Sequence, residues 1–299
     1  MFSTAKLREV EKLLADSGSA QAVISQGDEV LLDWSSHAEP VDVYAVQKSI
    51  LLLLIGIAED KYLLETLDNI NHHLEPEWTQ LSPWDEAKLS IETLLSMTTG
   101  MADDLSLSGE INQTWRYNNV AYNYLKQILM LHTEMSLQAL SEDWLFGPLG
   151  MTQSHWYDRD EVLPNGQAVT GLRATAKDLL AIGKLILARG RWQDQQLVQD
   201  FFFDQALQSA PAENPAWCWG LWRNDREFYL RAMAETKGPV PGNIVPAAPQ
   251  DLIAARGAYG NYIHVVPGLE LVVVRTTTPE LVVGKGFEQA LWEILQDVS

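Results

Sequence analysis

Strand-like patterns occupy both ends of the chain, and a long stretch with helical spacing lies between them. Residues 22–25 and 29–34 are apolar-rich segments on either side of a glycine-containing tight turn, which is typical of a hairpin. Residues 260–266 and 269–275 form a second pair around a Pro-Gly turn. Because an isolated hairpin is only marginally stable in water, we expect both hairpins to share one antiparallel sheet.

Apolar residues at helical spacing mark several further regions. Residues 6–15 and 281–298 predict a helix near each end, and the apolar stretches within 48–132 predict buried helices. A well-marked helix follows Thr175, where Asp178 completes the pattern of a capping box.

These patterns predict an α+β fold in which an antiparallel sheet, built from both termini, is flanked by helices and joined to a helical lobe. Ile24 and Val273 should then lie in the same sheet. We expect one domain over residues 1–299, with an α/β subdomain at about 1–65 and 220–299 and a helical subdomain at about 66–219.

The charge balance narrows the choice of partners. The chain has 40 acidic and 21 basic side chains, for a formal net charge of −19. A field of this sign repels phosphate backbones and anionic lipid surfaces. We therefore expect neither a nucleic-acid nor a membrane partner.

The start of the chain is charged and amphipathic, without the apolar core and small-residue cleavage site of a secretory signal. The longest apolar run, residues 50–58, is much shorter than the roughly 18 to 20 residues that a membrane span needs. These features predict a soluble, cytoplasmic protein.

Cysteine and histidine give no sign of a disulfide, metal or cofactor. Cys218 is the single cysteine, and we expect it to be packed in the core rather than reactive. The six histidines lack metal-ligand spacing, so no metal site is expected. Trp217, Trp219 and Trp222 nearly alternate, and they could either fill the core or line a substrate cleft.

Three short segments carry residues suited to catalysis. Ala45 and Lys48 head the apolar helix that begins at Ile50, and their spacing places both side chains on one helical face. Tyr117 and Asn119 are a second group. The third segment, residues 255–261, precedes a predicted strand and contains Gly257, Ala258 and Tyr259.

The three segments resemble motifs of serine β-lactamases, penicillin-binding proteins and related esterases. Ala45 and Lys48 match the S-x-x-K motif except that alanine replaces the serine, and Tyr117 and Asn119 match the Y-x-N motif. Residues 255–261 partly match the K-T-G or H-x-G motif. Three further segments resemble family signatures in the same order, namely residues 91–101, 146–151 and 171–179.

The resemblance implies a role for each matched residue. Lys48 would accept the nucleophile's proton, and Tyr117 would share in proton transfer as a base, its phenolate favoured by the lysine. Asn119 would hydrogen-bond the substrate. Gly257 would let the backbone approach the substrate, and the amide of Ala258 would pair with that of Ala45 as the oxyanion hole. Tyr259 is expected on the substrate-binding side.

The match is incomplete at two positions. Ala45 has no nucleophilic atom, and Ser49 is a poor substitute because it lies about 100° around the helix from Lys48. Ala255 stands where the family usually has a cation, and Arg256 should point to the opposite face of the strand. The missing cation counts against a substrate held by its carboxylate.

We therefore expect a serine hydrolase scaffold of the esterase or amidase kind, acting on a small-molecule ester or amide through an acyl-enzyme, with its nucleophile absent. Either the serine was replaced deliberately, or a natural relative lost its chemistry and kept binding. The persistence of Lys48, Tyr117, Asn119 and Gly257 favours replacement. The alternative function is a catalytically silent binding protein that uses the same cleft; the oligomeric state is not predicted.

Overall fold

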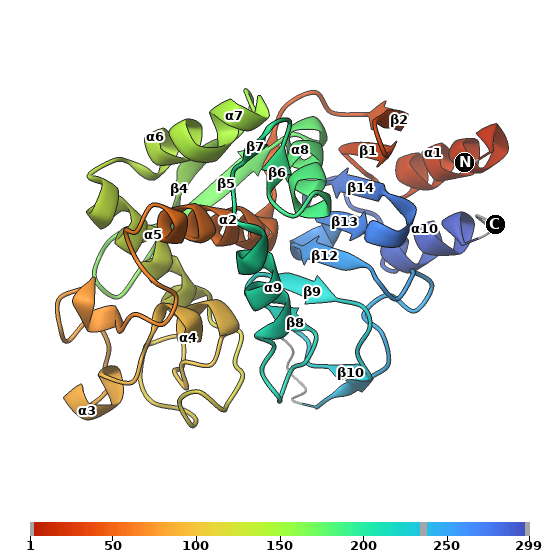
Figure 1. Cartoon of the computed structure of the whole chain (residues 1–299). Coiled ribbons are helices and arrows are strands. Elements are labelled where there is room, and N and C mark those ends of the chain that lie inside the picture. The colour runs from red at the N-terminus through yellow and green to blue at the C-terminus, as the bar shows by residue number, and fades with distance from the viewer. Residues whose placement is uncertain (1–2, 234–237, 297–299) are drawn as a thin grey trace.

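The two ends of the chain build one antiparallel sheet in the computed structural model, which describes residues 3–233 and 238–296 (Figure 1). Ile24 pairs directly with Val273, so the prediction of a shared sheet is confirmed. The sheet has seven strands in the order β2 (Glu29–Ser35), β1 (Gln21–Gln26), β14 (Leu271–Thr276), β13 (Tyr262–Val266), β12 (Ile253–Arg256), β9 (Leu221–Arg223) and β8 (Trp217–Cys218).

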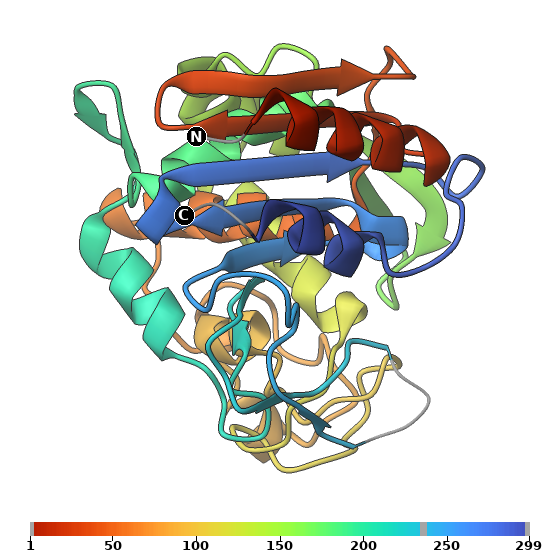
Figure 2. The ribbon, with the colours of Figure 1, turned by 90° about the vertical axis from the view of Figure 1, so that its right-hand side faces the viewer.

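Helices cover both faces of this sheet. Helices α1 (Thr4–Asp16) and α10 (Phe287–Leu295) pack together on one face, where Figure 2 shows them in front of the strands. Helix α8 (Ala176–Leu187) packs on β14, β13 and β1. The fit is close, since a Cβ at Gly183 of α8 would lie 2.4 Å from a methyl of Val272.

Helix α2 (Gln47–Asp60) is the central element of the helical part. Every residue of α2 from 47 to 58 is buried, which explains why this segment is apolar on all sides. It packs against α5 (Asn119–Thr133). The remaining helical segments are η1 (Tyr44–Val46), η2 (Ile70–His72), α3 (Pro83–Glu86), α4 (Ile91–Ser96), α6 (Leu137–Ser141), η3 (Glu142–Phe146), α7 (Gly147–Leu149), α9 (Asp200–Gln208), η4 (Ala258–Gly260) and η5 (Pro267–Leu269).

The region expected to form a helical subdomain also contains strands, and one of its helices packs on the large sheet. The region 66–219 is not purely helical, because β4 (His155–Val162) and β5 (Ala168–Ala174) pair there and are extended by β3 (Val41–Asp42). Helix α8 also belongs to that region but packs on the large sheet. The division into two subdomains stays a prediction. The other short pairs are β6 (Arg191–Trp192) with β7 (Gln195–Gln196) and β10 (Phe228–Tyr229) with β11 (Val240–Pro241).

Two helix ends differ in detail from expectation. Thr175 caps α8 as predicted, but the carboxylate of Asp178 accepts from Gln153 N and Ser154 Oγ at 3.0 and 2.8 Å and does not complete a capping box. The C-terminal helix begins at Phe287 rather than at 281, after glycines with positive φ at 284 and 286. The last residues of the predicted helix, 297 and 298, lie outside the described residues.

Throughout the described chain, no helix combines the length and apolar character needed to cross a membrane.

Candidate active site

A strained turn sets Ala45 at the entrance to α2. Tyr44 has a φ of 51°, a left-handed conformation that is costly for a bulky residue and is found at functional sites. The carboxylate of Asp42 accepts a hydrogen bond from Tyr44 N at 2.9 Å. The same carboxylate accepts from the Tyr157 hydroxyl at 2.7 Å and from Arg159 Nη2 at 2.6 Å. This network holds the backbone at residue 45.

Lys48 is a buried amine without a carboxylate partner. Its side-chain nitrogen donates to Asn119 Oδ1 at 2.7 Å. The rings of Tyr117 and Tyr122 flank it, with centroids 4.9 and 5.1 Å from Nζ. Burial, aided by the charge of Arg159, lowers the pKa of Lys48 to about 7. A substantial share of Lys48 is therefore neutral at physiological pH and able to accept a proton.

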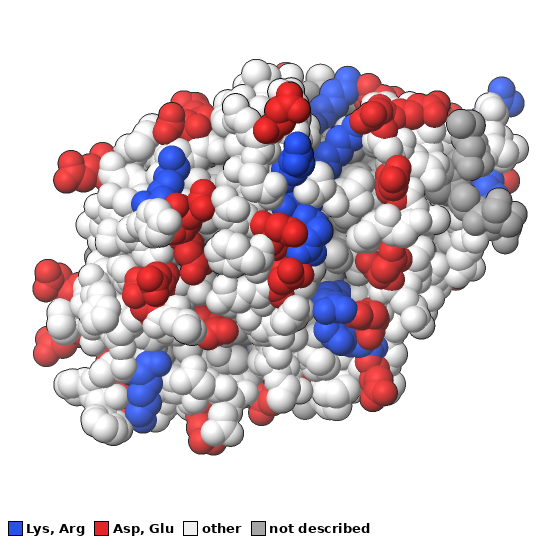
Figure 3. Space-filling model, in the orientation of Figure 1, with Lys and Arg blue, Asp and Glu red and all other residues white. Residues whose placement is uncertain are grey.

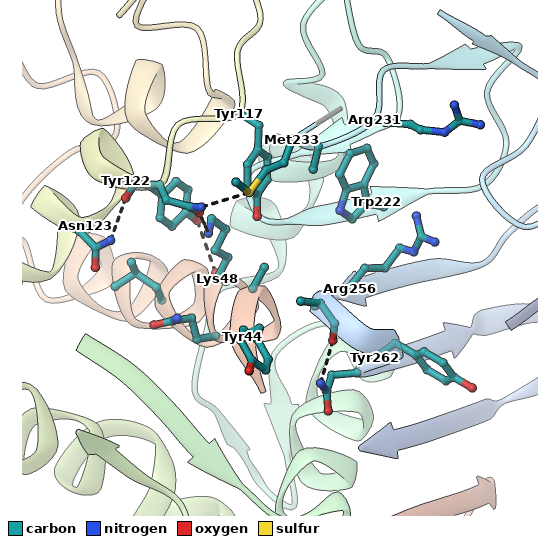
Figure 4. Close-up of a pocket in the computed structure, with 18 of the residues that line it drawn as sticks. Tyr44, Lys48, Tyr117, Tyr122, Asn123, Trp222, Arg231, Met233, Arg256 and Tyr262 are labelled. Carbon is teal, nitrogen blue, oxygen red and sulfur yellow. Dashed lines mark hydrogen bonds between the residues drawn. The ribbon is translucent and has the colours of Figure 1, made fainter. Parts of the chain in front are cut away.

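The predicted residues converge on one cavity of about 530 Å³ (Figure 4). Tyr259 does not line this cavity; its ring packs edge-on against Tyr44, with centroids 5.1 Å apart. Ser49 donates to the carbonyl of Val46 at 2.8 Å and is buried in the core, so it cannot replace the missing nucleophile. The predicted residues that do line the cavity are Ala45, Lys48, Tyr117, Asn119, Gly257 and Ala258.

Gly257 lets the end of β12 approach the turn that carries Ala45. A Cβ at this position would lie 2.4 Å from Val43 O and 3.3 Å from Ala45 N. Gly257 therefore allows a close approach to the chain's own backbone, and its expected approach to the substrate stays a prediction. The amides of Ala45 and Ala258 donate to no acceptor within the described chain. Two such free donors beside one cavity are suited to an oxyanion.

Tyr117 differs in protonation from the expectation. Its removal from water raises its pKa, and this effect opposes the phenolate that was expected beside Lys48. The hydroxyl therefore stays protonated and can donate a hydrogen bond. Figure 4 shows Tyr117 beside Lys48.

The three tryptophans fill the core, and one of them also lines the cavity. Trp217 and Trp219 are fully buried, and Trp217 Nε1 donates to Leu95 O at 2.9 Å. Trp222 packs on Trp217, with centroids 5.1 Å apart, and also lines the cavity. Cys218 is buried in this region, which raises the pKa of its thiol to about 12 and makes it unreactive at neutral pH.

Lys126 is a second buried amine that the sequence analysis missed. Its Nζ donates to Gln47 Oε1, Asn123 Oδ1 and Thr170 O at 2.7, 2.9 and 2.7 Å. It also lines the cavity. The sequence does contain a signal that points to Lys126, because Asn119, Asn123 and Lys126 follow the spacing of one face of α5.

Arg256 points to the face of β12 opposite Ala255, as predicted, and it also lines the cavity at the end of the strand. Its guanidinium donates to Glu288 from Nε at 3.1 Å and from Nη2 at 2.5 Å. His264 Nδ1 accepts from Trp292 Nε1 at 2.9 Å, so its Nε2 carries the proton that it donates to Glu288 at 2.7 Å. Burial alone would raise the pKa of Glu288, but Arg256 and His264 lower it to about 2.

No group of three or more His, Cys, Asp or Glu side chains in the described ranges is arranged to hold a metal ion. The polar groups that line the cavity are amines, phenols, amides, guanidinium groups and the carboxylates of Glu161 and Glu288.

Comparison with known proteins agrees with this geometry. The model of the beta-lactamase family matches residues 7–285, whereas no curated protein sequence matches the chain. Solved structures share the fold at low sequence identity. A Bacteroides dorei protein assigned as a beta-lactamase is 17% identical with a TM-score of 0.72, over 99% of this chain and 98% of that one.

Two other structures are similar to the chain to the same degree. A Bacillus anthracis protein assigned as a 6-aminohexanoate-dimer hydrolase is 13% identical with a TM-score of 0.73, over 96% of this chain and 80% of that one. EstCE1, a hydrolase with promiscuous acyltransferase activity, is 15% identical with a TM-score of 0.71, over 98% of each chain. The family model spans nearly the whole chain, and this chain therefore belongs to the beta-lactamase family.

Proposed function

We propose that the chain is the scaffold of a serine hydrolase that cleaves an ester or amide through an acyl-enzyme, and that it is inactive as written because Ala45 replaces the serine. The observation that carries this proposal is the placement of Lys48. Its amine lies in the same cavity as Ala45, is held by Asn119 at 2.7 Å, and has a pKa of about 7. That is the value a general base needs at neutral pH.

A hydroxyl at position 45 would complete the following chemistry. Its oxygen attacks the substrate carbonyl carbon while its proton passes to Lys48 Nζ. The oxyanion that forms accepts hydrogen bonds from the amides of Ala45 and Ala258. When the tetrahedral intermediate collapses, the leaving group takes a proton from Lys48 or from the protonated Tyr117. Water then hydrolyses the ester on residue 45 by the reverse sequence.

The retained partners favour replacement of a serine over decay of the whole site. Without a nucleophile, nothing in catalysis requires a buried lysine, and a buried unpaired amine lowers stability. Lys48 is nevertheless kept, together with its contact to Asn119 and the strained Tyr44. A catalytically silent binding protein is the competing function, since the cavity itself remains open.

The wall of the cavity suggests the class of substrate. Tyr44, Tyr117, Trp222 and Tyr229 supply aromatic surface for an acyl or leaving group. The likeness to EstCE1 and to the protein assigned as a 6-aminohexanoate-dimer hydrolase supports an ester or a linear amide. We propose a small-molecule substrate of this kind.

The deciding experiment restores the hydroxyl. Ala45→Ser is assayed with a panel of p-nitrophenyl esters and anilides, and intact and peptide masses are recorded. We expect a burst of product and an acyl adduct on residue 45, with neither in the Ala45 protein. Loss of a serine nucleophile costs about 10⁶-fold in a protease, so the contrast should be large. If no ester or amide gives an adduct while the Ala45 protein binds a ligand tightly, the binding function replaces this proposal.

A further inference from the structure

A row of polar side chains crosses three strands at the end of the large sheet. Arg256 of β12 pairs with Tyr262 of β13, and Tyr262 pairs with Arg275 of β14. Paired residues on neighbouring strands point to the same face of a sheet. The row thus presents guanidinium, phenol and guanidinium groups on the face that carries α10.

Tyr262 has an unused hydrogen-bonding group. Its side chain is 2% exposed, and its hydroxyl finds no partner among the described residues. Buried polar groups are almost always hydrogen-bonded, so an orphaned hydroxyl calls for an explanation. Figure 4 shows Tyr262, Arg231 and Arg256 extending away from Lys48 toward the same side. They meet there in a second hollow of about 950 Å³.

Acidic side chains are spread over the face of the molecule that Figure 3 shows, in keeping with the net charge of −19, whereas the hollow is lined mainly by cations. Arg231 and Lys285 are exposed and form no ion pair within the described chain. Arg275 is buried, and its hydrogen bonds go only to neutral oxygens, including Ser19 Oγ at 2.8 Å and Gly260 O at 3.0 Å. A buried cation without a carboxylate partner is costly. The charged residues lining the hollow are Arg231, Arg256, Arg275, Lys285 and the single carboxylate Glu288.

The first turn of α10 also faces the hollow. Its N-cap, Gly286, has no side chain to satisfy the free backbone amides of this turn. Glu288 stands in the same turn, but Arg256 and His264 already bind its carboxylate. Helix N-termini attract anions through such amides and the helix dipole.

We propose that this hollow binds an oxyanion, a carboxylate or a phosphate, which accepts from the Tyr262 hydroxyl and is held by Arg231, Lys285 and the first turn of α10. The hollow and the catalytic cavity share Arg231, Arg256, Gly260, Tyr262 and Glu288. One ligand can therefore occupy both. Resting on the proposed function, the inference is that the substrate is an anionic ester or amide whose charged end lies away from the reacting carbonyl.

Binding is tested first on the Ala45 protein, without reference to activity. Calorimetric titrations with sodium succinate and with inorganic phosphate at low salt should show saturable binding that weakens as sodium chloride is added. Tyr262→Phe should weaken binding roughly tenfold through the lost charge-assisted hydrogen bond. Tyr124→Phe is the matched control, because the Tyr124 hydroxyl is also buried without a partner among the described residues and Tyr124 lines neither the cavity nor the hollow. The tighter of the two anions identifies the group.

A charge variant provides a second control. Lys285→Gln should weaken binding about threefold, as expected of one exposed cation. Lys177→Gln removes the same charge on α8, where Lys177 pairs with Asp33 at 2.8 Å, and should leave the affinity unchanged. The anion site would be overturned if the titrations showed no heat of binding. It would also be overturned if Tyr262→Phe and Lys285→Gln each bound the anion as tightly as their control variants.

The link to the substrate is tested in Ala45→Ser with two esters of equal acyl length, p-nitrophenyl pentanoate and the p-nitrophenyl hemiester of glutaric acid. The hemiester should show a lower KM, and Lys285→Gln should remove that advantage without changing the pentanoate rate. Cleavage of both esters without preference, together with flat titrations, defeats the anion site and leaves the proposed function standing. Cleavage of neither, with Tyr262-dependent anion binding, defeats the proposed function and leaves the anion site standing.

Discussion

The side-chain nitrogen of Lys48 lies 2.7 Å from Oδ1 of Asn119, a contact between residues 71 positions apart in the sequence. Asn119 is the first residue of α5, and the side chain of Asn118 caps that helix by accepting from Ala121 N at 2.9 Å. The cap therefore fixes the residue that holds the lysine. Because Asn119 is neutral, it orients Lys48 without stabilising its charged form as a carboxylate would. This pairing allows a buried lysine to act as a base near pH 7.

The first prediction concerns the pH dependence of Ala45→Ser. Lys48 must be neutral to accept a proton, and its pKa is about 7. Hydrolysis should therefore rise as pH increases through about 7 and fall as Lys48 is protonated below it. Asn119→Asp should move the midpoint upward, because a carboxylate favours the ammonium form. The measurement is kcat/KM against pH for both proteins. The same midpoint in both would argue against Lys48 as the base.

The second prediction concerns Tyr117, whose burial keeps its hydroxyl protonated. In Ala45→Ser, Tyr117→Phe should lower kcat by about 100-fold for alkyl esters, whose leaving groups need a proton. The loss should be much smaller for p-nitrophenyl esters, whose leaving group departs as a stable anion. An equal loss for both ester types would indicate that Tyr117 acts as a base or only supports the cavity.

Much of the fold could be predicted from sequence because local periodicity determined it. The apolar-rich character of residues 22–25 and 269–275 indicated strands, and β1 and β14 are buried on both faces. The need to cover two weak hairpins brought Ile24 opposite Val273. The predicted C-terminal helix began too early because apolar spacing continues through 281–286, whereas the backbone at Gly284 and Gly286 is not helical.

The site could be predicted in part for a related reason. Lys48, Tyr117 and Asn119 lie in short motifs whose spacing is visible in the chain. Strand alternation predicted the face to which Arg256 points, but its partner Glu288 lies on another element and was not predictable from local spacing. The pKa of Tyr117 depends on its burial in the fold, which the adjacent residues in the sequence do not indicate. Arg159 reaches the cavity from β4 through its ion pair with Asp42, and no local pattern marks it.

The third prediction concerns the stability that Glu288 contributes. Its pKa of about 2 lies below the ordinary value of 4.5, so its stabilisation is fully present above about pH 4.5 and is lost as pH falls toward 2. Glu288→Gln should lower the free energy of unfolding by about 3 kcal/mol at pH 7, because Arg256 loses its partly buried carboxylate partner. Urea denaturation at several pH values measures this.

A control on the same helix separates this effect from a general loss of charge. Glu293→Gln removes an exposed carboxylate of α10 and should change stability by less than about 0.5 kcal/mol. The difference between the parent and Glu288→Gln should shrink below pH 4.5. A difference that stays constant down to pH 2 would show that Glu288 acts by packing rather than by charge.

The fourth prediction concerns Gly257, where a Cβ would lie 2.4 Å from Val43 O. Because that neighbour is backbone, Gly257→Ala must push β12 away from the turn that holds Ala45. We expect a loss of about 1 to 3 kcal/mol in stability, as for other overpacked positions. In Ala45→Ser, activity should fall about 100-fold or more, because the amides of Ala45 and Ala258 separate and one oxyanion donor is lost.

Gly238→Ala is the matched control for this substitution. A Cβ at Gly238 would meet no atom within 4 Å, so both stability and activity should stay close to those of the parent. Urea denaturation and ester hydrolysis are measured on both glycine variants in the Ala45→Ser background. A Gly257→Ala protein that is destabilised but fully active would show that the close approach serves the fold alone. The two free amides would then not be the oxyanion hole, and the proposed acyl transfer would need other donors.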